Sequence, residues 1–336
     1  MIYFSFIYVL FTFLIAIYFK KQNYLSNFSG DNHQLFSNKK DIPLVGGILL
    51  FIPLIFLNFQ NFFLIAAITF ITLIGLLSDR KILASPKKRF LFQLAFVIIS
   101  VISLDLEIIT SRIDFFDDLF KINIFNIIFT SFCLLILING SNFIDGLNGL
   151  LSIYMIMVLL VIFKLELIPQ NNIDKNLFIN FIFLFVILTI LNLFNLLMLG
   201  DTGAYLISFF AGYLIIACHK LNPNISPYFF ITLIWYPCYE NLFSIIRKLK
   251  SKFSPLTPDN NHLHQLFYKL IKKKLFKNKL FANNTSSILI NLSNLVIILL
   301  SLKDPYNTVY QIKLITGSTI FYTIFFMFLK NKINSL

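Results

Sequence analysis

Four groups of polar side chains lie where long apolar runs of the sequence end. They are Asp79, Asp145, Asp201 and the pair His262 and His264. Carboxylate oxygens bind hard cations such as Mg²⁺, and imidazoles hold phosphate oxygens or metals, or move protons near neutral pH. These residue types suit a reaction on a phosphate group, provided that the fold brings them to one place.

Asp201 lies between Gly200 and Gly203 in a very short connection between two apolar runs. Glycine lets a backbone approach a ligand closely. A carboxylate beside apolar segments is costly unless it holds a cation, and Mg²⁺ binds few carboxylates together with phosphate oxygens. Asp201 is therefore the candidate metal ligand. The alternative is that it caps the helix beginning near Thr202.

Asn139, Asn142 and Asp145 are spaced three residues apart at the end of another apolar run, just before Gly146. This spacing puts them on or near one side of a helix end, where they can converge on one polar ligand. Turn chemistry accounts for the Asp-Gly pair. It does not account for two amides inside the end of an apolar run.

Several cations accompany the acidic and imidazole groups. Asp79 is followed by a basic segment that includes Lys88 and Arg89, and Lys40 precedes a Gly-Gly pair. A carboxylate surrounded by cations suits a pocket for Mg²⁺ and a diphosphate. The alternatives are that the cations only set membrane orientation and that Lys40 lies in an ordinary loop. The two histidines could likewise belong to a plain surface loop.

The composition places these residues in an integral membrane protein. Of the 336 residues, 58% are hydrophobic and only 13% are charged, and the mean hydropathy is +0.81. Helices of roughly 20 apolar residues cross a bilayer. We therefore predict an all-α, polytopic fold with about 10–11 transmembrane helices in one domain, 1–336. The expected spans are near residues 2–19, 44–58, 61–78, 90–104, 124–140, 147–163, 177–198, 203–218, 226–246, 285–302 and 314–329.

The distribution of cations predicts the orientation. Most of the 28 Lys and Arg residues fall on connections of one face, which the positive-inside bias makes cytoplasmic. The N-terminus is then outside. The net charge of +13 reflects this orientation and could also attract a phosphorylated substrate, whereas nucleic-acid binding is not expected. The predicted cytoplasmic catalytic loops are 20–43, 79–89, 139–149, 199–204 and 247–284.

At this point the sequence resembles the polyprenyl-phosphate N-acetylhexosamine-1-phosphate transferases. This family includes undecaprenyl-phosphate GlcNAc-1-phosphate transferase and the phospho-MurNAc-pentapeptide translocase of peptidoglycan synthesis. The resemblance spans residues ~31 to 265. It is carried by five motifs in the family's order: Asp31 with Pro43-Leu44-Val45-Gly46-Gly47, Ser78-Asp79-Arg80 through Arg89 and Gln93, Asn139-x-x-Asn142-x-x-Asp145-Gly146, Gly200-Asp201-x-Gly203, and Ser254-Pro255-x-x-Pro258-Asp259 with His262-x-His264.

The resemblance implies an enzyme of the bacterial inner (cytoplasmic) membrane that uses Mg²⁺, with Mn²⁺ as an alternative. A polyprenyl (undecaprenyl) phosphate would attack the β-phosphorus of a UDP-N-acetylhexosamine, giving a polyprenyl diphosphate sugar and UMP. Its N-terminus would be periplasmic and its active site cytoplasmic. The product would start an envelope glycan such as the O-antigen of lipopolysaccharide. Beyond the lipid bilayer and the two substrates, a homodimer is a further expected partner.

The resemblance also implies roles for the site residues. Asp201 would bind the metal, and Asn142 is assigned with it. The remaining candidates are catalytic (Asp79, Asp145, His262, His264) or bind the nucleotide sugar (Asn139, Asn142, Lys40, Lys88, Arg89).

Three positions depart from the family pattern: Ser78 stands where a second acid is usual, and Asn148 and Gln265 stand where a further Asp and a further His are common. A serine without its own base is a poor nucleophile. We therefore expect a single displacement by the lipid phosphate, which is already ionised. Two alternatives stay open: the peptidoglycan translocase, and a transporter. Against a transporter, the acids gather at one face and only Glu240 lies inside a predicted span.

Overall fold

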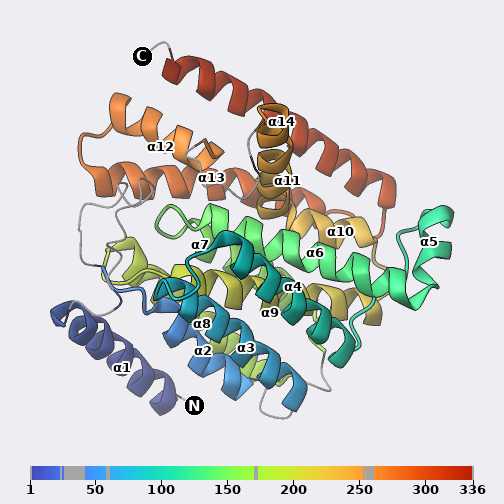
Figure 1. Ribbon diagram of the computed structural model, residues 1–336, viewed down its shortest axis with the longest axis horizontal. Coiled ribbons are helices and arrows are strands. Elements are labelled where there is room, and N and C mark those ends of the chain that lie inside the picture. Colours follow the sequence, from blue (N-terminus) through green and yellow to red (C-terminus); the bar gives the residue numbers. More distant parts are fainter. Residues whose placement is uncertain are drawn as a thin grey trace.

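The computed structural model describes residues 2–22, 25, 42–57, 61–169, 173–252, 254 and 261–334. These residues form helices and connections without a β-sheet (Figure 1). The helices are α1 (Ile2–Lys21), α2 (Gly46–Leu57), α3 (Phe62–Asp79), α4 (Pro86–Ser103), α5 (Asp114–Phe120), α6 (Asn123–Ile144), α7 (Leu150–Lys164), α8 (Lys175–Leu193), α9 (Gly200–Leu221), α10 (Pro227–Leu233), α11 (Trp235–Lys250), α12 (Leu263–Lys274), α13 (Lys279–Ser301) and α14 (Thr308–Asn334).

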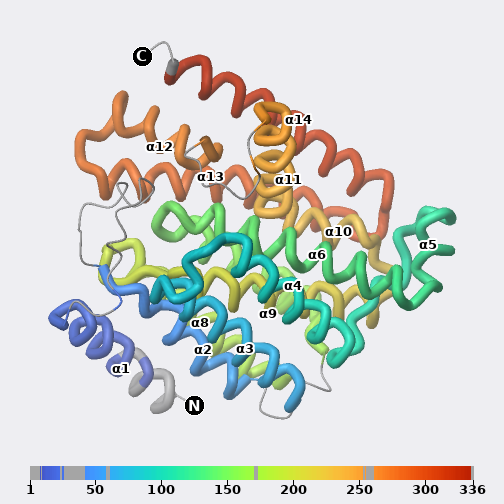
Figure 2. Tube along the Cα trace, viewed as in Figure 1, coloured from blue at the N-terminus to red at the C-terminus, as the bar shows by residue number. Residues whose placement is uncertain are grey.

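Every predicted span coincides with a helix or a helix pair, which confirms the polytopic all-α fold. In the part of the chain that the structure describes, six helices are long and apolar enough to cross a membrane: α3, α6, α8, α9, α13 and α14. A bent pair, α10 with α11, raises that number to seven. The other four predicted spans correspond to α1, α2, α4 and α7, of which α2 and α7 are apolar but only 12 and 15 residues long. The tube in Figure 2 runs from α1 at one edge of the molecule to α14 at the opposite edge.

The predicted span over 226–246 is not one straight helix, because the chain bends by 78° between α10 and α11. Pro237 lies in the first turn of α11, where a residue without an N–H group is tolerated, but it could not continue the ladder of α10. The bend brings α11 close to α6. A side chain at Gly140 of α6 would collide with the carbonyl of Pro237, and Nδ2 of Asn241 donates to the carbonyl of Ile136 at 3.0 Å.

Helix α9 is the centre of the core, and nearly all of its residues are buried. Its N-terminus fits between α2 and α3 at two glycines. A side chain at Gly47 of α2 or at Gly75 of α3 would collide with the backbone of Thr202. The first turn of α9, which carries Asp201, is therefore held against two neighbouring helices at backbone distance.

Several connections that the sequence assigns to the outer face contact one another. On one side, Nη2 of Arg112 donates to the carbonyl of Asn224 at 2.6 Å, and its Nη1 donates to the carbonyl of Tyr306 at 2.9 Å. Sγ of Cys218 lies 3.1 Å from the carbonyl of Leu167 on the same side. These contacts join the connections assigned to the outer face, while Asp145 and Asp201 lie at the other ends of α6 and α9.

Candidate active site

Asp79, the last residue of α3, accepts hydrogen bonds from the first turn of α9. Its Oδ1 accepts from the backbone N–H of Asp201 at 2.9 Å. Its Oδ2 accepts from the backbone N–H and the hydroxyl of Thr202 at 3.0 and 2.5 Å. A carboxylate in this place accepts hydrogen bonds from the free N–H groups of the first turn, and its negative charge interacts favourably with the helix dipole. Asp79 thus fixes the helix end that carries Asp201.

Gly200 is required for this arrangement. It has a φ of +70°, which non-glycine residues rarely adopt, and a Cβ atom there would lie 2.7 Å from Oδ2 of Asp79. The alternative in which Asp201 itself caps α9 is wrong. The N-cap of α9 is Leu199, without a side-chain hydrogen bond, and the capping carboxylate comes from α3.

The carboxylate of Asp201 meets three other side chains. Its Oδ2 accepts from Oγ of Ser78 at 2.5 Å, from Nη1 of Arg89 at 2.9 Å and from the hydroxyl of Tyr205 at 3.2 Å. The ion pair with Arg89 is half-buried, so solvent screens it only partly. Oγ of Ser78 also accepts from Nη1 of Arg89 at 2.9 Å. Arg89 therefore lies in the site, whereas its neighbour Lys88 is exposed to solvent.

Asp145 is the residue that ends α6, and it is half-buried. Burial, followed by the negative charges of Asp201 and Asp79, raises its pKa well above the usual range for a carboxyl. The three carboxylates therefore lie within electrostatic reach of one another. We call Asp79, Asp145 and Asp201 the acidic cluster. Arg89 contacts this cluster through Asp201, and a cation bound beside the carboxyl groups would favour their charged forms.

The two predicted asparagines on α6 differ in their surroundings. Asn142 is half-buried one helical turn before Asp145, so that its amide lies on the same side of the helix end. The amide of Asn139 donates to the carbonyl of Leu135 in its own helix at 2.9 Å. Asn142 is thus close to the acidic cluster, while the Asn139 donor is used within α6.

Side-chain amides hold the turn after Asp145, and except for Asn148 none of them was singled out from the sequence. The backbone N–H of Asn148 donates to Asn283 at 2.8 Å, and that of Gly149 donates to Asn192 at 2.6 Å. The side chain of Asn148 donates to Asn195 at 2.7 Å. We call Asn148, Asn192, Asn195 and Asn283 the asparagine network. Asparagines inside apolar helices were the sequence signal that could have revealed it.

The two predicted histidines lie beside this turn. The ring of His264 is buried and stacks on that of His262, with centroids 5.8 Å apart. A Cβ atom on Gly146 would lie 2.7 Å from Nε2 of His264, so this ring contacts the turn that follows Asp145. Burial lowers the pKa of His264 to about 3, and the ring is therefore neutral at physiological pH. Gln265, in place of a histidine, forms a capping box with His262.

The acidic cluster offers the kinds of ligand that the predicted Mg²⁺ ion uses. Among the described residues, no three His, Cys, Asp or Glu side chains lie close enough together to hold an ion on their own. Mg²⁺ does not require such a cage, because it usually keeps several waters and binds one or two carboxylates with substrate phosphates. Carboxylate and amide oxygens are ligands that fit an ion of this kind. Lys40 and the segment Pro255–Asp259 lie outside the described residues.

The fold and the site define a polytopic helical membrane protein whose polar site is built from helix ends on one side. Comparisons with known proteins agree with this class. Residues 61–219 match the family described as "Glycosyl transferase family 4". The chain is also 24% identical, over 270 residues that cover 78% of it and 79% of the relative, to the "Undecaprenyl-phosphate alpha-N-acetylglucosaminyl 1-phosphate transferase" of Thermotoga maritima. The resemblance predicted from the motifs is thereby confirmed. The matched segment contains the acidic cluster and Arg89 but ends before His262.

Proposed function

We propose that the protein transfers N-acetylhexosamine-1-phosphate from a UDP-sugar to polyprenyl (undecaprenyl) phosphate. The observation that carries this proposal is the set of contacts among Asp79, Asp201 and Arg89 at the N-terminus of α9, with Asp145 in electrostatic reach. The family match and the name of the Thermotoga relative support the same activity. The location in the bacterial inner membrane, with this site in the cytoplasm, is part of the proposal and is supported by the bias of the cations.

The reaction is a single displacement at phosphorus. A phosphate oxygen of the lipid forms a bond to the β-phosphorus of the UDP-sugar, and the bond from that phosphorus to the bridging oxygen breaks, which releases UMP. The lipid phosphate is ionised at neutral pH, so no side chain has to remove a proton from it. Catalysis then depends on positioning and on neutralising charge.

Ser78 is not the nucleophile in this proposal. Its hydroxyl donates to Asp201 and accepts from Arg89. The Asp201 carboxylate is paired with Arg89 and is assigned to the metal in this proposal, which makes it a weak base toward the serine proton. The serine holds the carboxylate and the guanidinium together, so that Arg89 can exchange part of its contact with Asp201 for the diphosphate of the substrate.

We further propose that Mg²⁺, or Mn²⁺ in its place, is the cofactor, held by Asp201 and Asn142 with Asp145 nearby. Bound there, the ion would neutralise charge on the diphosphate. Asp79 keeps Asp201 in place through the backbone of α9. Lys88, Lys40 and the histidines are proposed to contact the nucleotide sugar, and association as a homodimer is proposed without a surface assigned to it.

The direct test uses purified protein in lipid nanodiscs with radiolabelled UDP-GlcNAc, undecaprenyl phosphate and Mg²⁺. We expect label in the lipid fraction and release of UMP. A panel of UDP-sugars then identifies the sugar. Lack of lipid-linked label with every UDP-N-acetylhexosamine would refute the proposal, whereas transfer from UDP-MurNAc-pentapeptide alone would assign the protein to the peptidoglycan alternative.

A further inference from the structure

A buried carboxylate outside the acidic cluster is bonded from two sides. Glu240 lies in α11, just after the bend, and is only 1% exposed. Its Oε1 lies 2.9 Å from Nδ1 of His262. Its Oε2 accepts from the hydroxyl of Tyr322 at 2.6 Å. An acid inside a membrane-spanning segment is costly and is usually retained for a function.

Tyr322 belongs to α14, which crosses α11 in Figure 1 and lies outside the segment that matches the family. The ring of Tyr322 also packs edge-on against Tyr239 and Phe243 of α11. The hydroxyl that meets Glu240 is therefore held in place by ring packing. Through it, the C-terminal helix reaches a residue next to the candidate active site.

The contact with Glu240 decides which nitrogen of His262 carries the proton. A carboxylate accepts a hydrogen bond, so the Nδ1 that faces it carries a proton. Carboxylates that orient histidines in this way fix both the ring and its tautomer. The His262 ring lies 5.0 Å from Phe143 and is stacked on His264. It is thus placed beside the end of α6 that carries Asn142 and Asp145.

We propose that Glu240 and Tyr322 are positioning residues for His262: Tyr322 holds the carboxylate, and the carboxylate holds the imidazole toward the substrate phosphates. This proposal rests on the transferase function proposed above. It adds α11 and α14 to the helices on which turnover depends. The contacts also stabilise packing between helices, so the test has to separate the two effects.

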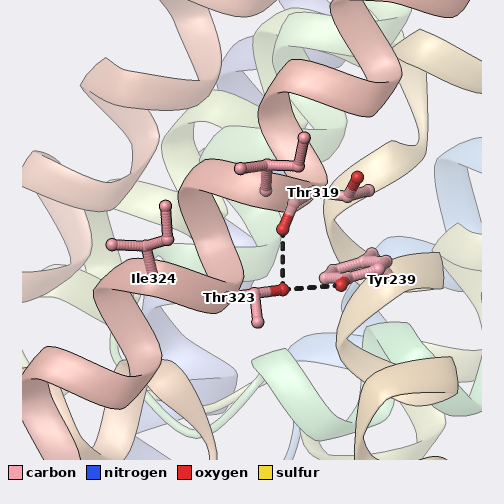
Figure 3. Close-up of a pocket in the computed structure, with 5 residues that line it drawn as sticks. Tyr239, Thr319, Thr323 and Ile324 are labelled. Carbon is pink, nitrogen blue, oxygen red and sulfur yellow. Dashed lines mark hydrogen bonds between the residues drawn. The ribbon is translucent and has the colours of Figure 1, made fainter.

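The chain offers a matched control for helix packing. Tyr239 on α11 makes a hydroxyl contact with Thr323 on α14 at 2.8 Å, one residue along from Tyr322, and Thr323 donates in turn to the carbonyl of Thr319 (Figure 3). Tyr239→Phe and Tyr322→Phe each remove one hydroxyl bond between the same two helices. Only Tyr322→Phe removes a bond to Glu240.

In steady-state assays of the full chain in nanodiscs, Tyr322→Phe should lower kcat and leave KM for both substrates unchanged, whereas Tyr239→Phe should leave kcat unchanged. Glu240→Met, which has no acceptor for Nδ1–H, should lower kcat by about 10–100-fold. Glu240→Gln keeps an acceptor oxygen and should lose less. Equal effects of the two tyrosine variants, or full kcat in Glu240→Met, would overturn the proposal.

A second measurement does not need activity. Nitrogen NMR of the ¹⁵N-histidine-labelled protein, with the His262 signals assigned by their loss in His262→Gln, reports the tautomer. We expect the Nδ1–H form in the wild type and a mixture in Glu240→Met. An unchanged tautomer in Glu240→Met would overturn the positioning role. If the tautomer changes in Glu240→Met but the wild type transfers no sugar phosphate, the pairing of Glu240 with His262 stands and the proposed function is refuted.

Discussion

Asp79 of α3 accepts a hydrogen bond from the backbone of Asp201, so one acid of the cluster determines where the other one lies. The two residues are far apart in the sequence, and they have different tasks. Asp79 uses both of its oxygens on the first turn of α9. In the contacts described above, Asp201 accepts hydrogen bonds from Ser78, Arg89 and Tyr205 through the same oxygen, Oδ2.

The first prediction concerns Asp79→Asn. An amide keeps one acceptor oxygen and turns an NH₂ group toward an N–H of α9, so a helix cap is weakened by about 1–2 kcal/mol. We expect a lower melting temperature together with a lower kcat, because Asp201 moves with the helix end. Asp174, which caps α8 through the N–H groups of Asn176 and Leu177, is the matched control. Loss of kcat in Asp174→Asn as well would show that general destabilisation is the cause.

The second prediction concerns Asp201→Asn. It should reduce turnover by more than about 100-fold, since it removes the proposed metal ligand and the partner of Arg89, while the protein stays inserted in the membrane. Asp105→Asn serves as the control, because that exposed carboxylate pairs with Lys220 among the connections assigned to the outer face. Turnover by radiolabel transfer and membrane insertion by fractionation are measured together. Full activity in Asp201→Asn would exclude this residue from the metal site.

Much of the site could be predicted, because acids that end apolar runs are visible in the sequence. The arrangement around them was not visible. The rotation of α4 against α9 decides which cation after Asp79 contacts Asp201. Lys88 and Arg89 are adjacent, yet Arg89 contacts Asp201 whereas Lys88 is exposed to solvent. The break at α10 and the asparagine network depend on contacts between residues distant in the sequence. Apolar periodicity does not report such contacts.

The third prediction tests the single displacement through Ser78→Ala. This change removes one hydrogen bond to the Asp201 carboxylate, and bonds to charged groups are worth about 1.5–3 kcal/mol. We expect turnover to fall by roughly tenfold to a hundredfold and to remain measurable. If the reaction instead passed through a phosphoserine at Ser78, Ser78→Ala would abolish turnover completely. Trapping of radiolabelled phosphate on the wild-type protein, absent in Ser78→Ala, would contradict the displacement proposed here.

The fourth prediction concerns Asn283→Ala in the asparagine network. The backbone N–H of Asn148 would lose its acceptor, and a buried unsatisfied donor costs about 1–3 kcal/mol. We expect a lower melting temperature and weaker activity, because the turn that follows Asp145 is loosened. Asn176→Ala, at an exposed position at the start of α8, should change neither quantity. Equal melting temperatures for Asn283→Ala and the wild type would show that the network does not hold the turn.

The fifth prediction follows from the buried His264. Its pKa is lowered from 6.5 to about 3 in the folded protein, so the unfolded chain binds a proton that the folded one does not as pH falls below 6.5. His264 therefore leaves the free energy of unfolding unchanged above pH 6.5. Below pH 6.5 it lowers the free energy of unfolding by up to about 1.4 kcal/mol for each pH unit. Melting temperatures of the wild type and of His264→Asn at pH 7.5 and pH 5 provide the measurement. The wild type should lose more stability than the variant over this interval, since asparagine does not titrate. The same loss in both proteins would mean that His264 takes up its proton without unfolding, and that its ring is not enclosed as the contact with Gly146 indicates.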